Sequence, residues 1–176
     1  MEFNFASVYI GILLVLLSIV AVLVIKQVFK TRRIETTLAK LERQVASGQA
    51  TPLEHYELGS LYLDKKIFTQ AIAQFQQALK AKDDLEPGNL ALIYNALGYA
   101  YIAQEQYDLA IRNYKEATKL EPDYVTAWNN LGFAYEKKQL TAQALDAYDS
   151  ALKADPTNDV AKRRAASLRR RLVPSS

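Results

Sequence analysis

The sequence lacks cysteine altogether, and it contains one histidine and six glycines among its 176 residues. Without cysteine there is no disulfide framework, no thiolate zinc site and no cysteine nucleophile. The glycines form no phosphate-binding loop, and neither an HExxH motif nor a nucleophile elbow occurs. The sequence therefore predicts a protein that is not an enzyme and that uses no cofactor, no metal and no small-molecule substrate.

One segment near the N-terminus lacks charge, since no charged side chain occurs from Phe5 to Ile25. A helix of these 21 residues is about 32 Å long and matches a hydrocarbon core of about 30 Å. A buried core helix would show a polar face, and this segment has none. It also lacks the basic start, the short apolar run and the cleavage site of a signal peptide. We predict a retained single transmembrane anchor within residues 1–30.

Positive charge lies on both sides of an acidic middle. Residues 26–43 carry six bases and two acids, residues 52–158 carry 10 bases and 15 acids, and the last 18 residues carry six bases and one acid. Bases beside a membrane span mark its cytoplasmic side, so we expect everything after Lys26 in the cytosol or an organellar equivalent. A nucleic-acid partner is not expected, because basic charge does not extend over one folded face.

Residues 31–51 read as a juxtamembrane helical stalk. Ile34, Leu38, Leu41 and Val45 form one apolar stripe at helical spacing, and Gly48 ends the helix. The next helix starts at Thr51, where a threonine followed three residues later by Glu54 forms a capping box.

Three segments after the stalk repeat one pattern: HYELGSLY, YNALGYAY and WNNLGFAY, starting at His55, Tyr94 and Trp128. A second apolar pattern of alanine, aromatic residue and alanine follows each segment. The second and third copies lie 34 residues apart, whereas five residues inserted around DLEPGNL separate the first two by 39. This periodicity predicts helical hairpins, which must stack because one hairpin cannot bury its apolar face.

Glycine recurs at one column of the repeat. A glycine inside a helix costs about 1 kcal/mol relative to alanine, so its recurrence predicts close helix packing. We expect alanines of the second helices to meet these glycines; the residues are Gly59, Gly98 and Gly132 with Ala71, Ala110 and Ala144.

These columns resemble the tetratricopeptide repeat family over Pro52 to Asn158, with His55 in place of the usual aromatic residue. The glycine usual in the turn between paired helices is replaced by Lys66, Glu105 and Gln139. The resemblance implies an all-α protein: one N-terminal transmembrane helix, an α-solenoid of three hairpins at 52–85, 91–124 and 125–158, and a basic capping helix and tail at 159–176. The arginines of the cap form either a solvated face or a contact with an anionic partner or membrane.

The same resemblance implies that the first helix of each hairpin lines a concave groove for partner proteins. The expected groove residues are Tyr56, Ser60, Leu63, Asn95, Tyr99, Ile102, Asn129, Asn130 and Phe133, with Leu53, Leu92, Thr126 and Glu136 beside them. Amides can hydrogen-bond a bound backbone, and the other side chains offer apolar contacts. The basic set that chaperone-binding members use for a terminal carboxylate is absent, so chaperone tails are not expected partners.

The layout of anchor, stalk, three repeats and basic cap resembles the membrane-anchored tetratricopeptide assembly factors of photosystem I, as does the run NALGYAYIAQEQYDLAIRNYKEATKLEPDY. This resemblance implies a thylakoid protein with its stack on the cytoplasmic or stromal face, handling photosystem I subunits or assembly intermediates. Two alternatives stay open: a targeting receptor that binds precursor segments, and a regulatory membrane tether for an enzyme or protease.

Overall fold

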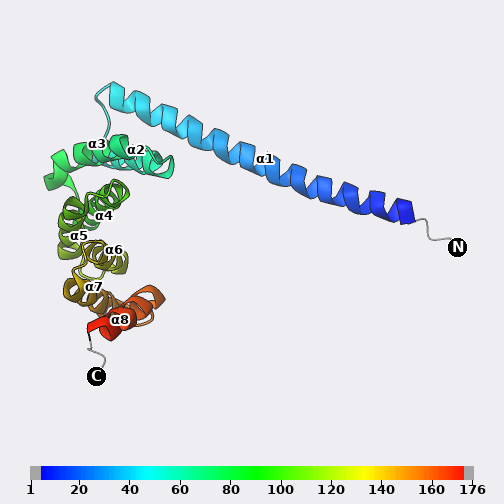
Figure 1. Cartoon of the computed structure of the whole chain (residues 1–176). Coiled ribbons are helices and arrows are strands. Elements are labelled where there is room, and N and C mark those ends of the chain that lie inside the picture. Colours follow the sequence, from blue (N-terminus) through cyan, green and yellow to red (C-terminus); the bar gives the residue numbers. More distant parts are fainter. Residues whose placement is uncertain (1–4, 173–176) are drawn as a thin grey trace.

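The computed structural model describes residues 5–172, and in this range all regular structure is helical, as the sequence predicts. Residues 1–4 and 173–176, the outer ends of the predicted anchor and cap, lie outside the described residues. Figure 1 shows a long rod, α1, that leaves one end of a stack of shorter helices. The elements are α1 (Phe5–Ala46), α2 (Pro52–Asp64), α3 (Phe68–Ala78), the 3-10 helix η1 (Leu79–Asp84), α4 (Pro87–Ala103), α5 (Tyr107–Leu120), α6 (Val125–Lys137), α7 (Thr141–Ala154) and α8 (Asp159–Leu172).

Helices α2 and α3, α4 and α5, and α6 and α7 form three hairpins, and α8 packs against α7 at the end of the stack. Each hairpin encloses one aromatic side chain of its second helix, at most 1% exposed: Phe75, Tyr114 and Tyr148. These rings lie at one repeat column, so the buried aromatic residue of each copy fills the space inside its own hairpin.

The repeated glycines face these aromatic rings. A Cβ atom added at Gly98 would lie 2.7 Å from Cε1 of Tyr114, closer than real Cβ contacts allow. The same holds for Gly59 against Phe75 and for Gly132 against Tyr148. The nearest neighbour of each glycine is therefore an aromatic ring, while the alanines expected to meet the glycines are fully buried in the core: Ala71, Ala110 and Ala144.

The five inserted residues form defined structure. After α3 the chain makes the 3-10 helix η1, and α4 then begins at Pro87. Proline suits the first turn of a helix because its missing N–H needs no partner there. The insertion therefore lengthens the first helix of the second hairpin, which has 17 residues where α2 and α6 have 13 each.

The turns inside the hairpins adopt the left-handed backbone conformation that glycine favours. Lys66, Glu105 and Gln139 have φ angles of 60°, 58° and 59°. Each turn thus keeps the geometry of the repeat without its usual glycine, at a steric cost of about 1–2 kcal/mol for a side-chain-bearing residue.

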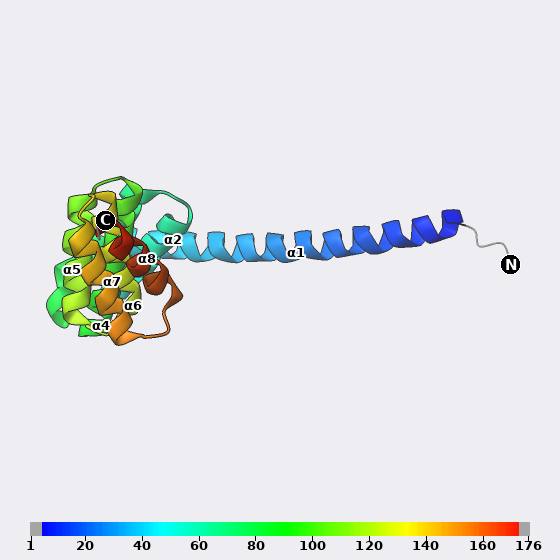
Figure 2. The same cartoon turned by 60° about the horizontal axis from the view of Figure 1, so that its bottom comes forward.

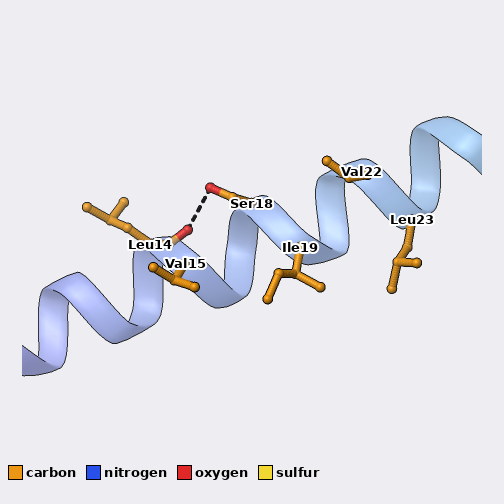
Figure 3. A pocket seen from close by; sticks show the side chains of 6 residues that line it. All are labelled: Leu14, Val15, Ser18, Ile19, Val22 and Leu23. Carbon is orange, nitrogen blue, oxygen red and sulfur yellow. Dashed lines mark hydrogen bonds between the residues drawn. The ribbon is translucent and has the colours of Figure 1, made fainter.

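Helix α1 is continuous, but its two halves have different surroundings. The large apolar side chains from Tyr9 to Ile25 are 51–71% exposed, and this part is long and apolar enough to span a membrane, with a mean hydropathy of 2.8 over its best window. Figure 3 shows one face of this half, where the Ser18 hydroxyl donates to the Leu14 carbonyl oxygen at 2.8 Å. The polar group is thereby satisfied within the helix, as an apolar solvent requires.

The second half of α1 docks on α2. Leu38 and Leu41 of the predicted stripe are buried in the common core. The Tyr62 hydroxyl donates to Oε1 of Glu42 at 2.9 Å, and Nε2 of Gln44 donates to Oε1 of Glu54 at 2.7 Å. The stalk is therefore the first packed layer of the stack, antiparallel to α2.

Both predicted helix ends at this junction are present. The Gly48 N–H donates to the Val45 carbonyl oxygen at 3.0 Å, with a φ angle of 71° at Gly48. Thr51 caps α2, and Glu54 completes the capping box by accepting a bond from the Thr51 N–H at 2.8 Å.

Candidate protein-binding groove

The candidate groove is the face of the stack formed by α2, α4 and α6, the first helices of the three hairpins. Helix α4 contacts α2 on one side and α6 on the other, so the three helices form a continuous layer. The second layer, α3, α5 and α7, backs this face (Figure 1). Every groove residue expected from the sequence lies on one of these three first helices.

The α2 end of the groove is closely tied to the core. The ring of Tyr56 is partly buried and packs against Phe75, with centroids 5.9 Å apart. The Ser60 hydroxyl donates to the Tyr56 carbonyl oxygen at 2.9 Å, and Leu63 packs against the buried cluster. Leu53 is the most accessible apolar residue here, with 47% of its surface exposed. This end therefore offers apolar surface more than free polar groups.

Amides link the middle of the groove. Nδ2 of Asn130 donates to Oδ1 of Asn95 at 2.9 Å, and Nδ2 of Asn95 donates to the Tyr124 hydroxyl at 3.2 Å. Tyr124 was not expected in the groove. It precedes α6 in the chain, and the residues at the same repeat column in the other copies and the cap are Thr51, Leu90 and Asn158, none of which is aromatic, so the repeat pattern did not point to it.

Aromatic and aliphatic surface surrounds these amides. Tyr99 is 53% exposed and Leu92 is 40% exposed, whereas Ile102 packs partly into the core. The ring of Phe133 is accompanied by the ammonium of Lys137, whose Nζ lies 5.3 Å from the ring centroid. Burial raises the pKa of Tyr114 behind this surface, and the phenols of Tyr99 and Tyr124 add to the effect. Burial likewise raises the pKa of Tyr124, so the phenols of Tyr114 and Tyr124 stay protonated.

Asn129 serves a different contact. Its Nδ2 donates to Oδ1 of Asn158 at 3.1 Å, and the same oxygen accepts the Ala161 N–H at 2.9 Å at the start of α8. Asn129 is thus joined to the cap, while the adjacent Asn130 points to Asn95.

Glu136, at the α8 end of the groove, has its charge balanced within the protein. The Tyr148 hydroxyl donates to Oε1 of Glu136 at 2.6 Å, and Nη1 of Arg164 lies 3.6 Å from Oε2. Burial raises the pKa of Tyr148, and the bond to the carboxylate raises it further. A partner therefore meets no free negative charge at this residue.

The geometry of this face suits recognition of a protein segment. Within residues 5–172 no group of three or more His, Asp or Glu side chains is arranged to hold a metal ion. The one histidine, His55, is partly buried, and its Nδ1 lies 2.8 Å from Oε1 of Gln74. Amides, phenols and exposed apolar groups on one face can bind the backbone and side chains of a protein segment.

Comparison with known proteins finds the repeat family along most of the stack. Family models described as TPR repeat and tetratricopeptide repeat match residues 55–85, 98–139 and 125–158. The structure is similar to the crystal structure of MamA, with a TM-score of 0.71 over 80% of each chain at 18% identity, which is a likeness of fold.

Two relatives match almost the whole chain. The chloroplastic tetratricopeptide repeat domain-containing protein PYG7 of Arabidopsis thaliana is 40% identical over 97% of this chain, which spans 56% of the length of PYG7. The protein ycf37 of Cyanophora paradoxa is 37% identical over 93% of this chain and 94% of its own length.

Proposed function

The chain belongs to the tetratricopeptide repeat family, in the group that includes ycf37 and PYG7, and from that premise we propose that it is a membrane-anchored scaffold for the assembly of photosystem I. Tetratricopeptide repeats are protein-interaction modules, so its general role is to bind protein partners. The anchor, the compartment and the identity of the partners are the proposed part.

The exposed surface of the middle hairpin carries the proposal of partner binding. Tyr99 and Leu92 remain 53% and 40% exposed on this face. Exposed aromatic residues on a preformed concave face are common anchors for a partner because they bury large areas at small entropic cost. The amides of Asn95 and Asn130 lie beside them and keep spare hydrogen-bonding capacity.

Membrane anchoring is supported by the solvent-facing apolar half of α1. A continuous apolar helix surface with no protein cover needs another apolar solvent, and the bilayer is one of matching thickness. Because Lys26, Lys30, Arg32 and Arg33 follow the span, we place the stack on the cytoplasmic or stromal side.

The choice of photosystem I rests on kinship. PYG7 carries the description chloroplastic, and the layout of this chain resembles photosystem I assembly factors from its anchor to its cap. We therefore propose the thylakoid membrane as the location and photosystem I subunits or assembly intermediates as the partners.

Co-purification from thylakoid membranes in mild detergent tests this function. The full-length chain is expected to retain photosystem I subunits, and Tyr99→Ala combined with Phe133→Ala is expected to reduce them about tenfold or more. Helix content measured by circular dichroism should stay unchanged, since both side chains lie outside the buried core.

A matched control removes two aromatic side chains from the other layer. Phe68 and Tyr107 begin α3 and α5, and both are partly exposed. Phe68→Ala with Tyr107→Ala should retain the photosystem I subunits. Equal recovery from both double variants would place the contact elsewhere, and recovery of unfolded precursors or of one stoichiometric enzyme would favour a targeting receptor or a tether.

A further inference from the structure

The capping helix α8 continues the groove. Asp159 follows Val125 by 34 residues, the repeat period, so α8 occupies the place of a fourth first helix. Its buried residues Ala161, Ala165 and Leu168 pack towards the stack. In this register Arg163, Arg164, Ser167 and Arg170 take the positions of Asn129, Asn130, Phe133 and Glu136. The contact of Arg164 with Glu136 joins the two helices at this face.

Several cations of α8 have no acidic partner. Arg164 is paired with Glu136 and Arg169 with Asp149. Among residues 5–172, no carboxylate lies within salt-bridge distance of the other four, which are all exposed: Lys162, Arg163, Arg170 and Arg171. Arg163 and Arg170 bond only to carbonyl oxygens of α8, at 3.3 Å and 3.4 Å, through Nε. Their terminal guanidinium nitrogens remain free to bind an acid.

The charge of the groove therefore differs between its two ends. On α4 the most exposed apolar side chains of this face are Leu92 and Tyr99, and α2 adds the exposed Leu53 together with the exposed carboxylate of Glu57, at the repeat column of Asn130. Its one acidic position in the third hairpin, Glu136, is balanced by Arg164 and Tyr148. Beyond Glu136 the charge is positive.

We propose that α8 forms a cationic end of the groove and binds an acidic stretch of the partner segment, while the apolar residues of that segment contact Leu92, Tyr99 and Phe133. The inference rests on the proposed function of the groove and adds the chemistry of its ligand. Free guanidinium groups bind carboxylates in bidentate geometry, and such complementary charge gives a ligand one orientation in a groove.

The position of α8 favours a protein segment over a lipid surface. Figure 1 shows α8 at the opposite end of the stack from α1, and in Figures 1 and 2 the C-terminal end of α8 lies on the side away from the apolar half of α1. The C-terminal end of α8 therefore does not face the apolar half of α1 that the proposed bilayer would surround. An acidic segment lying in the groove can contact both the apolar residues of α4 and the cations of α8.

Two labelled peptides test the proposal on the full-length chain in detergent. Both carry leucine and phenylalanine at helical spacing, followed by a run of glutamates in one peptide and of glutamines in the other. By fluorescence anisotropy the acidic peptide should bind about tenfold more tightly, and this preference should shrink at about 0.5 M salt because screening weakens exposed charge contacts.

Charge variants test which residues cause the preference for the glutamate peptide. Arg163→Gln, Arg170→Gln and Arg171→Gln together should abolish the preference for glutamate and leave binding of the glutamine peptide unchanged. The matched control, Lys80→Gln with Lys119→Gln and Lys153→Gln, removes three exposed cations from η1, α5 and α7 and should keep the preference. Equal binding of both peptides, absent binding, or equal behaviour of the two triple variants would overturn the proposal.

Two further measurements separate the possible failures. If the α8 variant keeps its peptide preference but floats less than wild type with vesicles containing phosphatidylglycerol, the cations serve lipid and the proposal is wrong. Tyr99→Ala with Phe133→Ala should weaken both peptides alike. If photosystem I subunits fail to co-purify while the α8-dependent preference persists, the proposed assembly role fails and the acidic-segment inference stands.

Discussion

The two halves of α1 are one helix with opposite relations to their surroundings. Leu14 in the first half is 59% exposed, whereas Leu41 in the second half is 3% exposed. Both are leucines in unbroken α-helix, so neither residue type nor local conformation distinguishes them. The difference is that α2 covers the second half and no described element covers the first.

This contrast indicates what each half contributes. The docked half completes the hydrophobic core and ends the stack, as a terminal repeat needs. The apolar half leaves a surface that the proposed bilayer would cover. Because Figure 1 shows no break between them, the direction of the span also sets the direction of the stack and of its groove.

The largest expected effect comes from removing leucines of the docked half. Leu38→Ala with Leu41→Ala should lower the free energy of opening α1 from α2 by about 2–4 kcal/mol per residue, because each change empties buried volume. Hydrogen exchange of the α2 amides in detergent should accelerate accordingly.

The control makes the same substitution in the apolar half. Leu13 and Leu16 are 56% and 54% exposed, so Leu13→Ala with Leu16→Ala should leave exchange in α2 unchanged. If both pairs accelerate exchange equally, the docking of α1 on α2 is not what protects the first hairpin.

An intermediate effect is expected at two glycines. Alanine raises helix propensity by about 1 kcal/mol at either position. At Gly98 the new Cβ would collide with Tyr114, and overpacking of this kind costs about 1–3 kcal/mol. At Gly11 no atom lies within 4 Å of an added Cβ.

Thermal unfolding in detergent should thus show a lower midpoint for Gly98→Ala and no loss for Gly11→Ala. A stabilised Gly98→Ala would mean that the ring of Tyr114 can shift without cost and that the column is not set by packing.

Much of the fold follows from local patterns in the sequence. The capping box at Thr51 and Glu54, the end of α1 before Gly48, and the helices at the repeat columns each depend on residues a few positions apart. Such signals act within one or two helical turns, so one sequence contains them completely. The stripe from Ile34 to Val45 was equally visible, but its partner was not, because α2 meets it only in three dimensions.

In the groove, too, the sequence reveals which residues are present but not which partners they contact in three dimensions. Asn129 and Asn130 are adjacent and chemically identical, yet one binds Asn158 and the other binds Asn95. A helix turns by about 100° per residue, so the two side chains face different neighbours. Likewise the small residues of the repeat were evident, but the pairing of Gly98 with the ring of Tyr114 depends on how the two helices are placed.

The smallest expected effect compares the turn that ends the docked half of α1 with the turns inside the hairpins. Gly48 adopts a φ angle of 71° and Gln139 one of 59°, so the same left-handed backbone is occupied by glycine in one and by a bulkier residue in the other. Gln139→Gly should raise the free energy of unfolding by at most about 1 kcal/mol, because relief of the steric cost is partly offset by the greater freedom of glycine in the unfolded chain. Gly48→Ala should lower it by a similar amount, since it adds a Cβ where the backbone disfavours one. Opposite shifts of the thermal midpoint would show that the two turns obey the same backbone preference, whereas a destabilised Gln139→Gly would mean that the glutamine side chain contributes a contact that outweighs its strain.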